Sequence, residues 1–160
     1  MATAAPAPEQ LQEEVEVSSP LNRMMIALLA LLGLLLSGYL SAYKLGLFGT
    51  IVCGTGGCDT VQSSPWAVFL GVPVPFIGFA GYAALFVVAL LGLQPRFVSS
   101  RSIATLLLAG ATAGLLFTAY LTYLEAAVIH AWCRWCLGSA AIATLIFFAA
   151  LPELRNLRRA

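Results

Sequence analysis

Charged residues are scarce in this chain. Only 9% of its 160 residues are Asp, Glu, Lys or Arg, whereas 61% are hydrophobic and the mean hydropathy is +0.93. These values lie outside the range of soluble globular domains and indicate a membrane protein. The net charge of +1 favours neither a nucleic acid nor an acidic substrate. A chain of this length has room for one compact bundle.

Histidine is also scarce, because His130 is the only one. A c-type haem needs a histidine directly after Cys136, and Leu137 stands there. Two cysteine pairs are also the pattern of a zinc site, but one pair opens an apolar run and the other has a wider spacing, which disfavours zinc. We therefore predict no metal site. His130 is expected to be a solvated loop residue, with proton relay as the alternative role.

Four long runs without a charged residue predict four transmembrane helices. A helix needs about 20 apolar residues to cross the hydrocarbon core of a bilayer. The first three runs reach that length and the fourth is shorter. The fold class that we predict is an all-α membrane protein, a four-transmembrane-helix bundle with an outer-face loop and a short lid helix. The predicted helices cover about residues 22–43, 74–93, 102–124 and 131–151.

Basic residues are distributed unevenly between the two ends of this predicted bundle. Of the eight Lys and Arg residues, only Lys44 and Arg134 lie on the side of the cysteines. The positive-inside rule then predicts two cytoplasmic termini and places all four cysteines at the outer, oxidising face. The predicted organisation is a disordered cytoplasmic tail at 1–20, a membrane domain at 21–152 with a periplasmic segment at 44–73, and a basic cytoplasmic tail at 153–160.

The predicted outer segment 44–73 contains signals for a lid. Glycines surround Cys53 and Cys58 and let the chain turn freely there. Residues 59–62 match a capping box, and Ser64 followed by a proline resembles an N-cap. We expect residues 66–70 to form a short apolar helix that lies over the open end of the bundle. This arrangement would bring Cys58 close to Cys133.

The four cysteines form two pairs with no thiol left over. Cys53 and Cys58 are five residues apart, and Cys133 and Cys136 are three apart at the start of the fourth run. The latter spacing allows a disulfide, and placement at a helix N-terminus favours the thiolate that attacks in thiol exchange. We interpret the pairs as a relay that moves two electrons between thiols and a quinone in the lipid. The alternative is two static structural disulfides.

Several other residues are candidates with a plainer explanation. Glu125 is expected to be a polar residue at the interfacial end of a helix. Asp59 lies beside Cys58, and its capping role suffices to explain it. Aromatic residues of the membrane runs are candidates to line a ring-binding cavity, although each one alone is more typical of packing. They are Phe76, Phe79, Phe117 and Tyr120.

Longer motifs resemble the bacterial branch of the vitamin K epoxide reductase family over about residues 20–152. They are Cys53-x4-Cys58-Asp-x-Val-x-Ser-Ser-Pro-Trp-Ala67, Pro-Phe-Ile-Gly-Phe-x-Gly-Tyr82, Tyr120-Leu-x-Tyr-Leu-Glu125 and Trp-Cys133-x-x-Cys136. The resemblance implies a four-helix membrane bundle around a quinone of the ubiquinone or menaquinone type. It also implies a disulfide-generating enzyme of the bacterial inner membrane. Animal members carry an Asn and a Tyr where this chain has Val74 and Ala140, which weakens any expectation of epoxide chemistry.

The resemblance also implies a role for each cysteine. Cys133 and Cys136 are the active-site pair, with Cys136 nearest the quinone. Cys53 and Cys58 are the shuttle pair, in which Cys53 faces the protein partner and Cys58 exchanges with Cys133. Many bacterial members carry a fused thioredoxin-like domain, which is not found here, so the expected partner is a separate periplasmic thioredoxin-like protein. The residues expected to bind the quinone are Ser64, Trp66, Ile77, Tyr120 and Leu121.

Two rival functions stay open. Another bacterial disulfide-forming quinone enzyme is also a four-helix bundle with two cysteine pairs, but its Cys-x-x-Cys pair precedes the wider pair, and here the order is reversed. The rival from a different class is a non-enzymatic membrane protein, an assembly subunit or channel with structural disulfides. Exchange of the cysteines with a reductant distinguishes the relay from this second rival.

Overall fold

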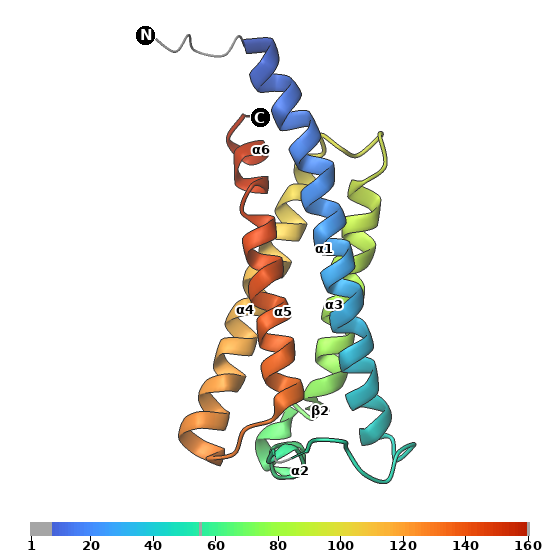
Figure 1. The fold of residues 1–160 in the computed structure, drawn as a ribbon, viewed down its shortest axis with the longest axis vertical. Coiled ribbons are helices and arrows are strands. Elements are labelled where there is room, and N and C mark those ends of the chain that lie inside the picture. Colours follow the sequence, from blue (N-terminus) through green and yellow to red (C-terminus); the bar gives the residue numbers. More distant parts are fainter. Residues whose placement is uncertain (1–7, 55, 160) are drawn as a thin grey trace.

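Four long helices form an antiparallel bundle in the computed structural model, which describes residues 8–54 and 56–159 (Figure 1). They are α1 (Pro8–Lys44), α3 (Val74–Gly92), α4 (Arg101–Leu124) and α5 (Arg134–Ala150). All four contain a stretch long and apolar enough to cross a membrane. The predicted membrane bundle is therefore confirmed. Except at the start of α1, the helix boundaries lie within a few residues of the charge-free runs.

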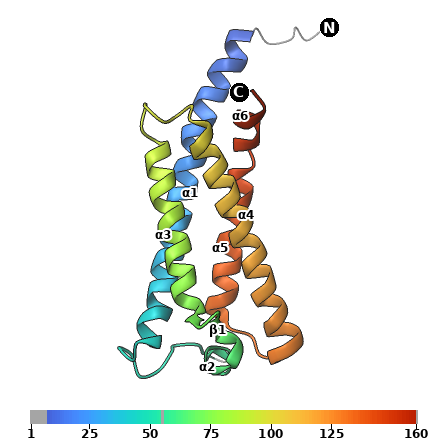
Figure 2. The ribbon, with the colours of Figure 1, turned by 180° about the vertical axis from the view of Figure 1, so that it is seen from behind.

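The helices enclose a central space. Helix α1 packs against α3 and α5, and α4 packs against the same two helices on the other side. Small residues allow the closest approaches, because a Cβ added to Gly33 of α1 would lie 2.5 Å from the ring of Tyr82 in α3. One buried apolar cluster fills the end of the bundle near the chain termini, and a second fills the opposite end. Figure 2 shows the same arrangement from behind.

The end near the termini is closed by a buried ion pair. The Arg23 guanidinium donates to both carboxylate oxygens of Glu153, at 2.8 and 2.9 Å, and to the main-chain oxygens of Gly92 and Val98, each at 2.8 Å. Arg23 and Glu153 are both fully or almost fully buried. These contacts satisfy the polar groups where α3 ends and α4 begins.

Both predicted tails are helical where the structure describes them. The prediction of a disordered segment at 1–20 is wrong for residues 8–20, which form the first turns of α1, and residues 1–7 lie outside the described residues. Glu and Gln favour helix, and extending an existing helix needs no new nucleation. The predicted basic tail at 153–160 is helix α6 (Glu153–Arg159) in its described part, and its first residue is held by Arg23.

The segment between α1 and α3 covers the opposite end of the bundle. It contains α2 (Cys58–Ser63), a 3-10 turn η1 (Pro65–Ala67) and an antiparallel hairpin of β1 (Val68–Phe69) and β2 (Val72–Pro73). In Figure 1 this segment lies at the end away from the termini. We call residues 45–73 the lid.

The internal structure of the lid differs from our prediction. The expected helix over residues 66–70 is wrong, because the hairpin occupies most of that range. Its turn places Leu70 and Gly71 at φ values of 51° and 82°, the left-handed region used by tight hairpin turns. Phe69 packs edge-on against Phe117 of α4, with ring centroids 5.6 Å apart, which secures the hairpin to the bundle.

The capping signals of the lid also differ from the prediction. Helix α2 begins at Cys58 with Gly57 as its N-cap, so Asp59 lies inside the first turn and is not a cap. Its acidic side chain suits that end of a helix dipole and accepts a hydrogen bond from the Tyr43 hydroxyl at 3.1 Å. Ser64 does precede the 3-10 turn, but its hydroxyl donates to the Val61 carbonyl and caps no amide.

Candidate functional site

The inner cysteine pair lies where α5 begins under the lid. Cys133 is the N-cap residue of α5 and Cys136 is the third residue of the helix. The first hydrogen bond of the helix joins the Leu137 amide to the Cys133 carbonyl at 2.9 Å. Both cysteines are free thiols, Cys133 is fully buried and Cys136 is half-buried. Helix α5 thus starts three residues later than predicted, and the pair occupies its N-terminal turn.

The pKa of Cys133 lies below that of an ordinary cysteine. A hydrogen bond from the Cys136 side chain lowers the pKa of Cys133 to about 7, and the backbone amides of Cys136 and Trp135 act in the same direction. Burial and the nearby Glu125 carboxylate oppose that change without reversing it. The lowered pKa favours the Cys133 thiolate, the form that attacks or leaves in disulfide exchange.

The outer pair is a disulfide in the lid. Cys53 and Cys58 are bonded to each other, with Cα atoms 6.0 Å apart. Their exposures differ, because Cys58 is fully buried while Cys53 is half-buried. Gly54, next to Cys53, has a φ of 62°, so the chain reverses at a residue without a side chain. Cys53 is therefore the more accessible cysteine of the outer pair.

The two pairs share one buried cluster. Cys58 and Cys133 are packed together with Leu40, Ile51 and Val61. The Gly57 amide donates to the Trp132 carbonyl at 3.0 Å, which connects the start of α2 to the segment that precedes α5. The predicted proximity of Cys58 and Cys133 is supported by this packing. The lid brings them together through α2 and not through the predicted helix over 66–70.

Aromatic residues fix the lid above the inner pair. The Trp135 indole donates to the Val52 carbonyl at 3.1 Å, and the Val52 amide donates to the Tyr39 hydroxyl at 3.3 Å. The rings of Tyr39 and Trp135 are themselves in contact, with centroids 5.1 Å apart. Val52, which directly precedes Cys53 of the outer disulfide, is thus attached to both α1 and α5.

Glu125 belongs to this site, although we predicted an interfacial residue. It is only 3% exposed, and one of its carboxylate oxygens accepts the Cys133 amide at 3.0 Å. Its side chain also contacts the Cys136 thiol. A π-helical turn, Glu125–Ile129, follows α4 and turns this side chain inward. His130 then ends the turn in a left-handed conformation and is exposed, as expected.

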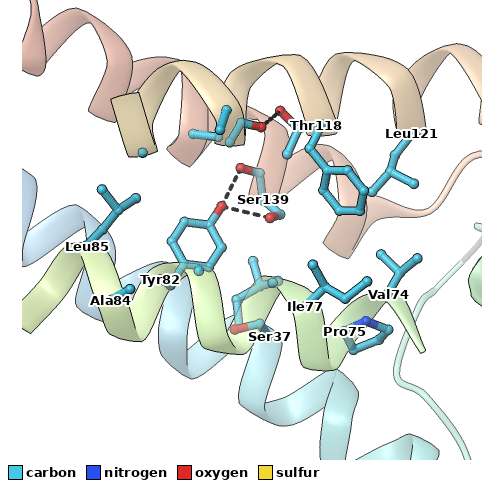
Figure 3. A pocket seen from close by; sticks show the side chains of 18 of the residues that line it. Ser37, Val74, Pro75, Ile77, Tyr82, Ala84, Leu85, Thr118, Leu121 and Ser139 are labelled. Carbon is cyan, nitrogen blue, oxygen red and sulfur yellow. Dashed lines mark hydrogen bonds between the residues drawn. The ribbon is translucent and has the colours of Figure 1, made fainter. Parts of the chain in front are cut away.

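A large apolar cavity extends from the inner cysteine pair into the bundle. Its volume is about 650 Å³, and Cys136 and Gln62 lie in its wall together with residues from all four long helices. In Figure 3, Ile77 and Val74 of α3 face Leu121 of α4 across the cavity. A small cavity of about 30 Å³ adjoins it beneath the lid and shares Gln62, Val74, Leu121 and Cys136 with it.

The predicted quinone-binding residues are divided between these two cavities. Ile77 and Leu121 line the large cavity, whereas Ser64 and Trp66 line the small one with Leu121. Tyr120 lines neither and is 41% exposed on the outside of α4. Of the four aromatic candidates, Phe117 alone lines a cavity. Val74 is part of both walls and Ala140 of neither.

The cavity fits a quinone in size and chemistry. Its volume lies in the range of pockets that hold small organic ligands, and its wall is mostly aliphatic and aromatic, as a prenylated ring requires. At its lid end the Cys136 thiol and the primary amide of Gln62 lie together, with the Gln62 nitrogen 3.8 Å from the Cys136 sulfur. In particular, the buried Gln62 Oε1 atom has no hydrogen-bond partner among the described residues, which suits a site that receives a polar ring oxygen.

These features define a multi-pass membrane protein with a cysteine pair and a disulfide beside an apolar cavity. The chain matches the model of the Vitamin K epoxide reductase family over residues 24–151 and therefore belongs to that family. The match covers the four-helix bundle and the lid, including all four cysteines. Members of this family are redox enzymes of the membrane that use quinones.

Proposed function

We propose that this protein is a membrane thiol:quinone oxidoreductase that generates disulfides in a protein partner and reduces a quinone. The observation that carries the proposal is the packing of Cys58 against Cys133 in one buried cluster, with Cys136 in the wall of the cavity. Two cysteine pairs that meet at a cavity of this chemistry form a continuous route for an electron pair. Membership of a family of redox enzymes supports the same function.

The first half of the proposed cycle is thiol exchange. A thiolate of the partner attacks Cys53, and the partner's second thiol resolves that bond, so the partner is oxidised and Cys53 and Cys58 become thiols. Cys58 then attacks Cys133 of the Cys133–Cys136 disulfide and releases the Cys136 thiolate. Cys53 next attacks Cys58, restores the outer disulfide and releases Cys133, whose pKa of about 7 makes it a good leaving group.

The state of the structure corresponds to the next step, because the outer pair is oxidised and the inner pair carries two thiols. A bound quinone accepts two electrons and two protons. Oxidation of the Cys133–Cys136 dithiol to a disulfide would supply these two electrons and two protons: Cys136 delivers the electron pair from the cavity wall, and Cys133 closes the inner disulfide on Cys136. Glu125, in contact with the Cys136 thiol and the Cys133 amide, is placed to hold the thiol proton. The aliphatic wall of the large cavity excludes water during this step.

The membrane orientation and the partner are part of the proposal. We place the protein in the inner membrane of a bacterium, where the positive-inside rule favours cytoplasmic termini and a lid in the periplasm. Both the start of α1 and the end of α6 lie opposite the lid (Figure 1), so one side of the membrane would hold both. The proposed partner is a separate thioredoxin-like protein, and the proposed cofactor is of the ubiquinone or menaquinone type.

Reconstitution with defined components tests this function. Purified protein is mixed with a reduced thioredoxin-like protein and decylubiquinone, or menadione in parallel, and the lost thiols and the quinol are counted. We expect one quinol for each partner disulfide formed. The Cys53→Ala variant should stop this reaction and still reduce quinone with dithiothreitol, whereas Cys136→Ala should stop both. Stable disulfides that never exchange with either reductant would instead identify the non-enzymatic alternative.

A further inference from the structure

Gln62 is a buried polar residue at the meeting point of the lid and the cavity. Its side chain is 4% exposed and lines both the large and the small cavity. Its Nε2 atom lies 3.8 Å from the Cys136 sulfur, to which it donates one of its two hydrogens. The Lys44 ammonium donates to the Gln62 main-chain oxygen and holds this part of α2 against the end of α1. The amide is thus positioned from two sides.

The other polar side chains that line the large cavity already use their hydrogens. Figure 3 shows the Tyr82 hydroxyl bonded to Ser139, at 2.9 Å to the carbonyl and 2.8 Å to the hydroxyl. The remaining hydroxyls donate to main-chain carbonyls of their own helices, at 2.7 to 3.0 Å. They belong to Ser37, Thr118 and Thr122. Of the described polar residues in that wall, only Gln62 keeps an uncommitted N–H.

The acceptor atom of the same amide is also unused. Gln62 Oε1 is buried and accepts no hydrogen bond among the described residues. A buried oxygen without a donor is unfavourable, and native structures keep such a group mainly where a ligand or water completes it. A quinone presents carbonyl acceptors, and the quinol presents hydroxyl donors. One amide can therefore match both redox forms.

We propose that Gln62 binds the head group of the quinone beside Cys136. The free N–H donates to a ring carbonyl of the quinone, and Oε1 accepts the hydroxyl of the quinol. This inference rests on the proposed function and names the residue that orients the ring. Because Gln62 also touches the Cys136 sulfur, the bound ring oxygen is held next to the thiol that delivers electrons.

The test compares two substitutions of Gln62 with a control. Gln62→Leu and Gln62→Met keep the volume and remove the amide. The control, Ser41→Ala, removes a buried hydroxyl that has no hydrogen-bond partner among the described residues and lines neither cavity. The assay follows reduction of decylubiquinone by dithiothreitol, so the protein partner is not needed. We expect the KM for decylubiquinone to rise about tenfold in both Gln62 variants, as the loss of one hydrogen bond predicts, and to stay unchanged in Ser41→Ala.

A second measurement separates binding from folding. The infrared carbonyl band of bound decylubiquinone should lie at lower frequency in the wild-type protein than in Gln62→Leu or Gln62→Met, because a donor weakens the carbonyl bond. Partner thiols should still reduce the Cys53–Cys58 disulfide in every variant at the wild-type rate. An unchanged KM and an unchanged carbonyl band would overturn the role of Gln62. A wild-type protein that reduces no quinone would instead overturn the proposed function.

Discussion

The Gly57 amide and the Trp132 carbonyl are joined by a hydrogen bond of 3.0 Å. Each of these residues directly precedes a buried cysteine, Cys58 in one case and Cys133 in the other. The bond therefore aligns the start of α2 with the start of α5. Glycine is needed at position 57, because a Cβ there would lie 2.8 Å from the Cβ of Ala131.

Gly57→Ala should weaken exchange between the two pairs without changing the inner pair. The backbone φ of Gly57 is −81°, which any residue adopts, so the effect comes from the contact with Ala131 alone. Overpacking of this kind costs about 1–3 kcal/mol, and we expect partner-driven quinone reduction to slow about tenfold while dithiothreitol-driven reduction persists. Gly49→Ala is the matched control, since no atom lies within 4 Å of its added Cβ. Equal rates for the two variants would exclude this contact as a determinant.

The acidity of Cys133 should depend on a donor at position 136. The Cys136 side-chain hydrogen bond is the largest cause of the lowered pKa of Cys133. In Cys136→Ala the thiolate should form only at higher pH, toward the ordinary cysteine pKa of about 8.5. Cys136→Ser keeps a hydroxyl donor and should keep the pKa of Cys133 near 7. Ultraviolet thiolate absorbance measures this directly, because each variant retains one free thiol beside the outer disulfide. Identical titrations of the two variants would contradict the assignment.

Glu125→Gln should have opposite effects on acidity and on turnover. The Glu125 carboxylate raises the pKa of Cys133, so removing its charge should lower that pKa below about 7. The glutamine oxygen can still accept the Cys133 amide, which preserves the local geometry. Loss of a proton acceptor should slow quinone reduction by about a hundredfold, as is typical of a missing general base. Full activity with a lowered pKa would show that Glu125 acts on the charge of the site and carries no proton.

The Arg23–Glu153 ion pair, at the end of the bundle away from the lid, should affect the stability of the protein and not its redox activity. Glu153→Gln leaves the Arg23 guanidinium buried without its charge partner, which costs about 3–5 kcal/mol. The midpoint of thermal unfolding in detergent should fall markedly. Arg101→Gln, at an exposed position, should leave it nearly unchanged. The KM for decylubiquinone should be the same in both variants, and a raised KM in Glu153→Gln alone would show that this end of the bundle also shapes the cavity.

The sequence predicted the bundle well because charge-free length determines which segments cross a membrane. It failed in the lid, where tertiary contacts decide local structure. The hairpin over 68–73 depends on the packing of Phe69 against Phe117, which no local pattern reveals. The burial of Gln62 and Glu125 could not be predicted from the sequence either. Local sequence rules place both polar residues at the end of a helix, where exposure is expected. Only the covering of the bundle by the lid makes them part of the site. The spacing Cys58-x3-Gln62 was the available signal for Gln62, because residues four apart share a helix face.

The coupling of the two cysteine pairs is tested most directly by trapping the intermediate between them. The double variant Cys53→Ala/Cys136→Ala keeps one cysteine of each pair and removes both thiols that would resolve a mixed disulfide. Because Cys58 and Cys133 lie in the same buried cluster, mild oxidation should yield a Cys58–Cys133 disulfide, seen as a crosslinked peptide by mass spectrometry of the non-reduced protein. Two free thiols in a protein that is otherwise folded would contradict the relay.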